Sequence, residues 1–262
     1  MAKRDIPEIN AGSMADIAFL LLIFFLVTTT MEKDTAYIRY IPQKLEDVPP
    51  PPEIENRNIF EIKANSANQL MIRGEIIENP DDISERVLEF YRMNEKLTAS
   101  QTQAYIQNSS YKGIDFPFYS RVTMQGIDDE INRNTDELER AEADDDENLI
   151  TFYTKVLKDW DKKKAALKTL GGKELVEIHP QAHVRIVVQQ QTEYKLFAKI
   201  HSEIQEALIE LRDEAAQEYF DDTYSKMTKR LDQDKDDKKG DRKKVAALEV
   251  LFPERIIEVK PN

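Results

Sequence analysis

The hydrophobic positions of this chain form one long apolar run near the N-terminus, followed by shorter segments in which apolar and polar residues alternate. The run extends from Met14 to Met31 and has no polar side chain between Ile17 and Val27. As a helix rising 1.5 Å per residue it would be about 27 Å long, close to the thickness of the hydrocarbon core of a bilayer. The pattern predicts a single transmembrane helix over residues 14–31.

The charges beside this run predict its orientation. Residues 1–13 contain Lys3 and Arg4, so the positive-inside rule places this tail in the cytoplasm. The residues that follow are then exported. A cleaved signal peptide is the alternative, but residues 28–32 lack a small-x-small cleavage site, which favours an uncleaved anchor. We expect a single-pass protein of the inner membrane with a periplasmic C-terminal domain.

Residues 32–57 read as an extended linker between the membrane and that domain. They include the alternating segment 36–42 and four consecutive prolines at 49–52. Consecutive prolines favour polyproline II, which is stiff and has no internal hydrogen bonds. The linker is therefore expected to hold the domain away from the bilayer.

The predicted domain, residues 58–262, begins with a hairpin and a helix. Alternation predicts a strand at Ile59–Ala64, a turn at 65–68 and a second strand at Gln69–Arg73, with Gly74 closing the hairpin. Asn79 and Pro80 mark a helix start. The apolar stripe of this helix is Ile83, Val87, Leu88 and Tyr91.

A strongly charged helical insert is expected at about 95–178. Two helices are predicted, separated near Asp144–Asp146 and ending at Gly171 and Gly172. Their charge indicates a solvated exterior. The apolar positions at helical spacing are Ile131, Leu138, Leu149, Phe152, Val156, Trp160 and Leu167.

After the insert the sequence again resembles a protein core. We expect a buried strand at His183–Val188, a flexible surface loop at Lys235–Lys244 and a last strand at Arg255–Val259. Between the strand at 183–188 and the loop at 235–244 we expect a helix. Its apolar stripe is Leu196, Phe197, Ile200, Ile204, Leu208 and Leu211. The predicted fold class is α+β: an N-terminal transmembrane helix followed by a small mixed α/β periplasmic domain with a helical insertion.

Composition narrows the range of functions. A net charge of −13 and a pI near 4.9 argue against nucleic acid as a partner. The absence of cysteine leaves the compartment undecided. No nucleophile motif or glycine-rich phosphate loop is found, so we expect neither an enzyme nor a cofactor.

No metal site is expected either. Pro180 prevents a regular helix through His179 and His183, and His201 has no partner nearby in the sequence. The acidic run at 144–146 lacks the glycine and ligand spacing of an EF-hand loop. A solvated helix junction is the favoured interpretation of this run.

Asp16 is the candidate functional residue. A carboxylate inside an apolar span costs about 2.5–3.5 kcal/mol on insertion scales, so such residues usually face protein or water and take part in ion or proton movement. Burial disfavours the charged form, so Asp16 can take up a proton near neutral pH. Thr28, Thr29 and Thr30 are candidates for the pathway or a helix interface, although termination of the helix at the membrane surface is the simpler interpretation.

The segment Met14–Leu26, with one acidic residue a turn into an apolar helix, resembles the membrane helix of the ExbD/TolR family of biopolymer transport proteins. Residues 57–60, 65 and 69–75 resemble the first hairpin of ExbD proteins from Bacteroidota. The resemblance resumes in residues 186–191 and 194, in the helix at 207–214 and at the closing 252–258. The insert departs from the family, and so does the polar run at 189–193.

The resemblance implies a mechanism and partners. Two copies of the helix, from this chain or from a paralogue, would lie inside a ring of ExbB/TolQ-like polytopic subunits, expected to be pentameric. There Asp16 would carry protons down the proton-motive force. The periplasmic domain would transmit force to a TonB-like protein by β-augmentation at a sheet edge or through the linker. The linker candidates are Tyr37, Ile38, Tyr40, Ile41 and Pro42.

Two alternatives stay open at this point. The first is a TolR-like motor subunit that keeps Asp16 but binds peptidoglycan and serves envelope integrity. The second is a pilin-like structural subunit, because pilins also carry an acid near the start of an apolar helix. The acid there is normally Glu and the first mature residue Phe, which weakens the second alternative.

Overall fold

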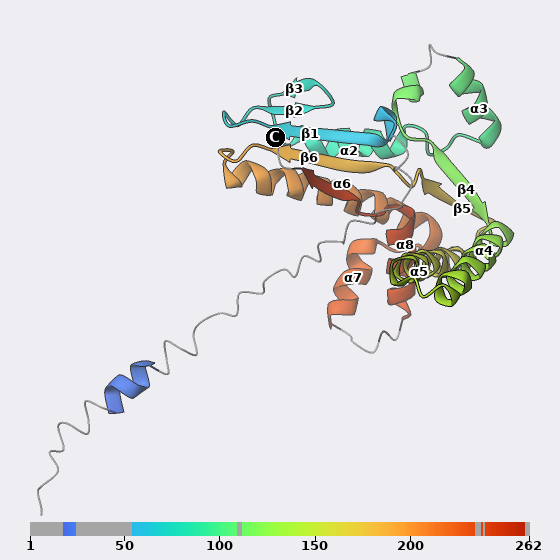
Figure 1. Cartoon of the computed structure of the whole chain (residues 1–262). Coiled ribbons are helices and arrows are strands. Elements are labelled where there is room, and N and C mark those ends of the chain that lie inside the picture. Colours follow the sequence, from blue (N-terminus) through green and yellow to red (C-terminus); the bar gives the residue numbers. More distant parts are fainter. Residues whose placement is uncertain (1–17, 25–53, 109–111, 234–236, 238, 260–262) are drawn as a thin grey trace, which may run out of the picture. The chain divides into compact units, whose positions relative to one another are not determined.

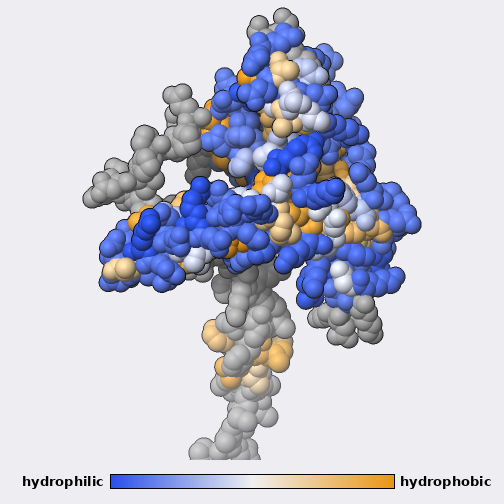
Figure 2. Space-filling model, turned by 90° about the vertical axis from the view of Figure 1, so that its right-hand side faces the viewer, coloured by the Kyte–Doolittle hydropathy of each residue, from blue (hydrophilic) through white to orange (hydrophobic). Residues whose placement is uncertain are grey.

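A computed structural model describes residues 18–24, 54–108, 112–233, 237 and 239–259. The chain divides into two units, Met1–Val48 and Pro49–Asn262, which are considered separately. In the first unit, residues 18–24 are helical with exposed side chains, and their apolar surface stands out in Figure 2. Within the described ranges, no helix combines the length and apolar character that a membrane span needs. Most of the predicted span, 14–31, lies outside those ranges.

A five-stranded mixed sheet organises the second unit (Figure 1). Its strand order is β3-β2-β1-β6-β7: β1 pairs antiparallel with β2 and parallel with β6, and β7 runs parallel to β6. The strands predicted around residues 59–64, 183–188 and 255–259 are confirmed. The bounds are β1 Ile59–Ala64, β2 Leu70–Ile72, β3 Glu75–Ile77, β6 His183–Val188 and β7 Ile256–Val259. A 3-10 turn, η1 Asn56–Asn58, leads into β1.

The alternation in β1 decides which face of the sheet is covered. Phe60, Ile62 and Ala64 are buried, whereas Glu61 and Lys63 point to the other face and are ion-paired there. Successive side chains of a strand point to opposite faces of the sheet. Helices can therefore pack against the face of Phe60, Ile62 and Ala64, but not against the charged face. The face of Glu61 and Lys63 is called the open face below.

The role predicted for Gly74 is wrong. Gly74 does not close the hairpin, because Arg73 and Gly74, with φ of 48° and 90°, form a two-residue turn into the additional strand β3. Turns of this kind need positive φ at both central positions and favour glycine at the second. Three residues of β3 were too few for an alternation signal in the sequence.

Two helices cover the buried face of the sheet and pack against each other (Figure 1). They are α2 Asp82–Arg92 and α6 Tyr194–Phe220. The predicted stripe of α2 is buried, and in α6 the residues from Ile200 to Leu211 of the predicted stripe are buried, while Leu196 and Phe197 are partly exposed. Apolar spacing of three and four residues places one stripe toward the sheet, so the sequence specified this layer.

The insert contains the two predicted helices, and their separation at residues 144–146 and the stop at Gly171 are confirmed. Leu149 and Phe152, however, are 40% and 56% exposed and are not part of the core. A two-stranded antiparallel sheet, β4-β5, was not predicted. The insert comprises α3 Ala99–Gln107, η2 Lys112–Asp115, β4 Tyr119–Thr123, α4 Met124–Ala143, α5 Glu147–Leu170 and β5 Glu174–Ile178.

The insert is not a separate solvated lobe. Helix α5 packs on α8 Asp241–Leu251, with Leu167 1% exposed. The carboxylate of Glu177 in β5, 2% exposed, lies 2.8 Å from Lys163 Nζ and 3.2 Å from Arg255 Nη2. A buried carboxylate needs such partners to offset lost hydration. These contacts join the insert to the segment before β7.

The loop predicted at Lys235–Lys244 is too long. Helix α7 is Tyr224–Gln233, and α8 already begins at Asp241. The Asp241 carboxylate is buried and accepts hydrogen bonds from Arg230 at 2.7 and 3.0 Å. This ion pair holds the first residue of α8 against α7. The many charged residues of this segment had led to the prediction of a loop instead of a helix start. The mixed α/β class of the domain is confirmed.

Candidate functional site

The site residues predicted from the sequence lie outside the described part of the chain. This holds for the proton-carrying candidate Asp16 and for the pathway candidates Thr28, Thr29 and Thr30. It also holds for the partner-binding candidates Tyr37, Ile38, Tyr40, Ile41 and Pro42. Their roles stay predictions, and the geometry described below belongs to the second unit, Pro49–Asn262.

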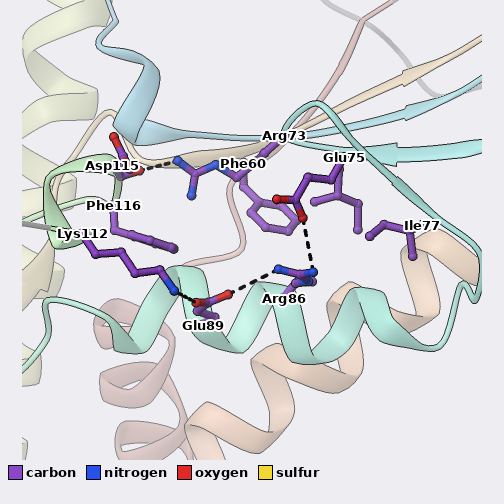
Figure 3. A pocket seen from close by; sticks show the side chains of 10 residues that line it. Phe60, Arg73, Glu75, Ile77, Arg86, Glu89, Lys112, Asp115 and Phe116 are labelled. Atoms are coloured by element: carbon purple, nitrogen blue, oxygen red, sulfur yellow. Dashed lines mark hydrogen bonds and ion pairs between the residues drawn. The ribbon is translucent and has the colours of Figure 1, made fainter.

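A hollow of about 280 Å³ lies between the β2–β3 hairpin and helix α2 (Figure 3). Its apolar walls come from three strands and one loop residue. They are formed by Phe60 of β1, Ile72 of β2, Ile77 of β3 and Phe116, which follows η2. We call this space the hairpin pocket. A space with apolar walls and charged groups around it suits a side chain or small group with one polar end.

Charged side chains line the α2 side of the hairpin pocket as a chain of ion pairs (Figure 3). Glu75 Oε2 lies 3.3 Å from Arg86 Nη2, and Arg86 Nη1 lies 3.9 Å from Glu89 Oε2. Lys112 Nζ lies 3.6 Å from Glu89 Oε1. These pairs are partly exposed and contribute little to stability. The two acidic and two basic side chains of these pairs neutralise one another. The remaining charged side chains that line the pocket are Arg73 and Asp115.

Arg73 sits in the hairpin pocket without a carboxylate partner among the described residues. Its guanidinium lies over the Phe116 ring, 4.7 Å from the centroid, and Nη2 donates to the backbone carbonyl of Asp115. Burial lowers the pKa of Arg73, against a smaller opposing effect of nearby acids, Asp115 foremost. A partly desolvated guanidinium of this kind favours an additional anionic partner.

Asn94 positions the segment that carries Asp115 and Phe116. Its buried Nδ2 donates to the carbonyls of Gly113, Phe116 and Pro117 at 2.7, 3.1 and 3.1 Å. The carbonyls of Phe116 and Pro117 thereby gain a partner, and the carbonyl of Gly113, which also accepts from the Phe116 backbone N–H, gains a second one. The far wall of the hairpin pocket is thus held in place by one side chain just after α2.

A second hollow, of about 330 Å³, lies on the open face of the same hairpin. Across the strands, Ile76, Met71, Lys63 and Val187 form one row, because their Cα atoms are successive register partners. Ile76 is 69% exposed. We call this the open-face groove. Together the two hollows lie on opposite faces of the β3 edge.

Sequence reasoning did not single out Arg73, Arg86 or Ile76. The signal that was available is the pair Arg73 and Gly74 followed by Glu75, Ile76 and Ile77, which fits a turn and a short strand. The meeting of Phe60, Arg86 and Phe116 carries no sequence signal, because it depends on tertiary packing.

The histidines of the described part of the chain contact backbone groups or a single carboxylate. His183 Nδ1 lies 2.7 Å from the carbonyl of Gln181, and His179 Nδ1 accepts from the Gln181 backbone N–H at 3.3 Å. His201 Nε2 lies 3.5 Å from Glu258 Oε1, a partner that the sequence did not reveal. No group of three or more His, Asp or Glu residues suited to a metal ion occurs among the described residues.

Comparison with known proteins identifies a family. Residues 2–113 match the family model described as "Biopolymer transport protein ExbD/TolR". The match covers the predicted membrane helix, the linker, the first hairpin and α2, and it ends near the hairpin pocket. No curated protein and no solved structure matches the chain.

Proposed function

Because residues 2–113 place this chain in the ExbD/TolR family of biopolymer transport proteins, we propose that it is the ExbD-like subunit of a proton-driven motor in the inner membrane. The motor would power TonB-dependent transport across the outer membrane. The family match bears out the resemblance noted in the N-terminal part. The resemblance of residues 180–262 lies outside the match and stays a prediction.

The observation that carries this proposal is Asp16 within the apolar run 14–31. A carboxylic acid in hydrocarbon changes its charge when it takes up or releases a proton, and only the neutral form is compatible with an apolar surface. The charge state therefore determines which surroundings the helix can face. Asp16 is the residue through which proton flow would be coupled to movement.

The energy available is sufficient for a conformational step. Moving one elementary charge through 100 mV releases about 2.3 kcal/mol. That is enough to change a two-state population by about fifty-fold, since 1.4 kcal/mol corresponds to a factor of ten. One proton per step can therefore bias rotation or sliding of the helix without any catalytic group, and we propose no enzymatic role.

The proposed arrangement follows from the same family resemblance. A ring of ExbB/TolQ-like subunits would surround two such helices, the second from another copy or a paralogue. The N-terminus would lie in the cytoplasm and residues 58–262 in the periplasm. Force would reach a TonB-like protein there, and the β3 and β7 edges of the sheet are the strand edges available within the described residues.

Replacing Asp16 with Asn tests the proposal, since Asn is nearly isosteric but does not ionise. We expect loss of proton-motive-force-dependent uptake through a TonB-dependent transporter, with normal expression and complex assembly. Asp5→Asn, the same change in the predicted cytoplasmic tail, is the matched control and should leave uptake unchanged. Full uptake by the Asp16→Asn protein would reduce the segment to an anchor and refute the proposal.

The TolR-like alternative shares the family match, because the matched model covers both ExbD and TolR. It differs in what the periplasmic domain holds. Co-sedimentation of the full chain with peptidoglycan, compared with capture by a TonB-like periplasmic domain, separates the two. We expect capture by the TonB-like domain; binding to peptidoglycan alone would favour the TolR-like role.

A further inference from the structure

The β3 strand presents a free backbone edge whose donor and acceptor can be assigned to one residue. Ile72 and Glu75 flank the two-residue turn and are register partners, so they form the hydrogen-bonded pair that closes such a hairpin. Pairs alternate along an antiparallel ladder, so Met71 and Ile76 are the non-hydrogen-bonded pair. The N–H and C=O of Ile76 therefore point away from β2, toward the edge of the sheet.

The two hollows described above flank this edge. Glu75 and Ile77 of β3 line the hairpin pocket, and Ile76 between them lines the open-face groove. In an added strand, successive side chains would enter the two hollows alternately. Backbone pairing combined with alternating side-chain sites is the arrangement by which proteins bind an extended peptide.

Charge indicates which side chain belongs in the hairpin pocket. Arg73 lacks a carboxylate partner among the described residues, and Phe116 covers one face of its guanidinium. Glu75 and Asp115 would repel an incoming acid. The Glu75 carboxylate is paired with Arg86 at 3.3 Å, and the effect of Asp115 on Arg73 is smaller than that of burial. An acidic side chain next to an apolar one therefore complements this edge.

We propose that the β3 edge binds an extended segment of a periplasmic partner protein. The segment would pair with the backbone of Ile76, place an apolar side chain against Ile76 and Met71, and direct a neighbouring Asp or Glu to Arg73. The proposal depends on the proposed function only for the compartment of the partner. It names the docking edge and the chemistry of the segment, which the family assignment does not.

Photo-crosslinking in intact cells tests this inference. The full chain carries p-benzoylphenylalanine at Met71, in the open-face groove, and the crosslinked partner peptide is sequenced by mass spectrometry. A second probe at Tyr194, which is 80% exposed on α6, controls for non-specific capture. We expect a product at Met71 alone, whose partner peptide has an acidic residue beside an apolar one.

Substitutions then separate backbone pairing from side-chain contact. Ile76→Pro removes the outward N–H without removing a hydrogen bond to β2. It should lower the yield of the crosslinked product about five- to tenfold, as for one lost hydrogen bond. Ile76→Thr keeps that N–H and should lower it less than Pro does. Arg73→Gln should lower it about tenfold or more, as for one charge-assisted bond. Arg133→Gln, on exposed α4, should have no effect.

The fluorescence of Trp160 under denaturant shows whether each variant is folded. If Ile76→Pro does not fold, Arg73→Glu combined with reversal of the partner's acidic residue to Arg replaces it, and recovery of the crosslink supports the proposal. An unchanged yield in folded Ile76→Pro overturns it. The proposal is also overturned if the crosslinked product contains a second copy of this chain, a glycan or a lipid, or if no product forms. Asp16→Asn should keep the crosslink while losing uptake, which separates this inference from the proposed function.

Discussion

Replacing Leu167 with Ala should reveal that the insert is part of the domain core. Leu167 lies on α5, a helix that packs on α8, and it is 1% exposed. The change removes three buried carbons, worth about 2.4 kcal/mol at about 0.8 kcal/mol each. The cavity left behind adds to this, and measured Leu-to-Ala costs at buried sites are about 2–5 kcal/mol. We expect a loss of about 3 kcal/mol in the free energy of unfolding.

Urea unfolding of the full chain in detergent, followed by tryptophan fluorescence, measures this loss. The chain has one tryptophan, Trp160, which lies on α5 and packs partly against the core. With a urea dependence of about 2–3 kcal/mol per molar, the midpoint should fall by about 1–1.5 M. The signal comes from the insert itself, so loosening of the insert is observed directly.

Leu149→Ala on the same helix is the matched control. Leu149 is 40% exposed, so its truncation should shift the midpoint by less than about 0.3 M, as for a typical surface change of at most 0.5 kcal/mol. Equal shifts for the two variants, or two separate transitions in the wild type, would refute the view that α5 is a core element. The insert would then be an independently folding arm.

Two further predictions use the same assay. Gly171 ends α5 at a φ of 69°, where a Cβ is strained, so Gly171→Ala should lower the free energy of unfolding by about 1 kcal/mol. Gly126→Ala inside α4, where a new Cβ meets only ordinary contacts, should leave that free energy unchanged or raise it. A larger loss for Gly126→Ala than for Gly171→Ala would contradict this. The hydrogen bond from Arg230 lowers the pKa of Asp222 and of Asp241 below their usual 3.8. The folded state then binds these protons more weakly than the unfolded state, so the stabilisation is present above pH 3.8 and is lost as pH falls through the lowered values. Arg230→Gln should therefore destabilise most at pH 5 and progressively less below pH 3.8, and a constant difference across this range would argue against the ion pairs as the cause.

The sequence determined the elements whose own residues carry a complete pattern. β1 alternates from Ile59 to Ala64, and α6 repeats apolar residues at helical spacing, so each shows its buried face without knowledge of its neighbours. Asp16 belongs to the same category, because one carboxylate in an apolar run is unusual whatever surrounds it. The two main layers of the domain therefore followed from local order alone, whereas the family and its expected chemistry came from a resemblance of the sequence.

Only the tertiary structure decided which distant groups meet. The hairpin pocket needs Phe60, Arg73, Arg86 and Phe116 from four segments, and the helix start at Asp241 depends on Arg230. β3 is too short to show an alternation of its own, and it is a strand because β2 pairs with it. Periodicity within one segment records which side of that segment is buried, but not what buries it. Contacts between segments are set by the packing of the whole chain, which is why the candidate site came from the structure and the proton-carrying candidate Asp16 from the sequence.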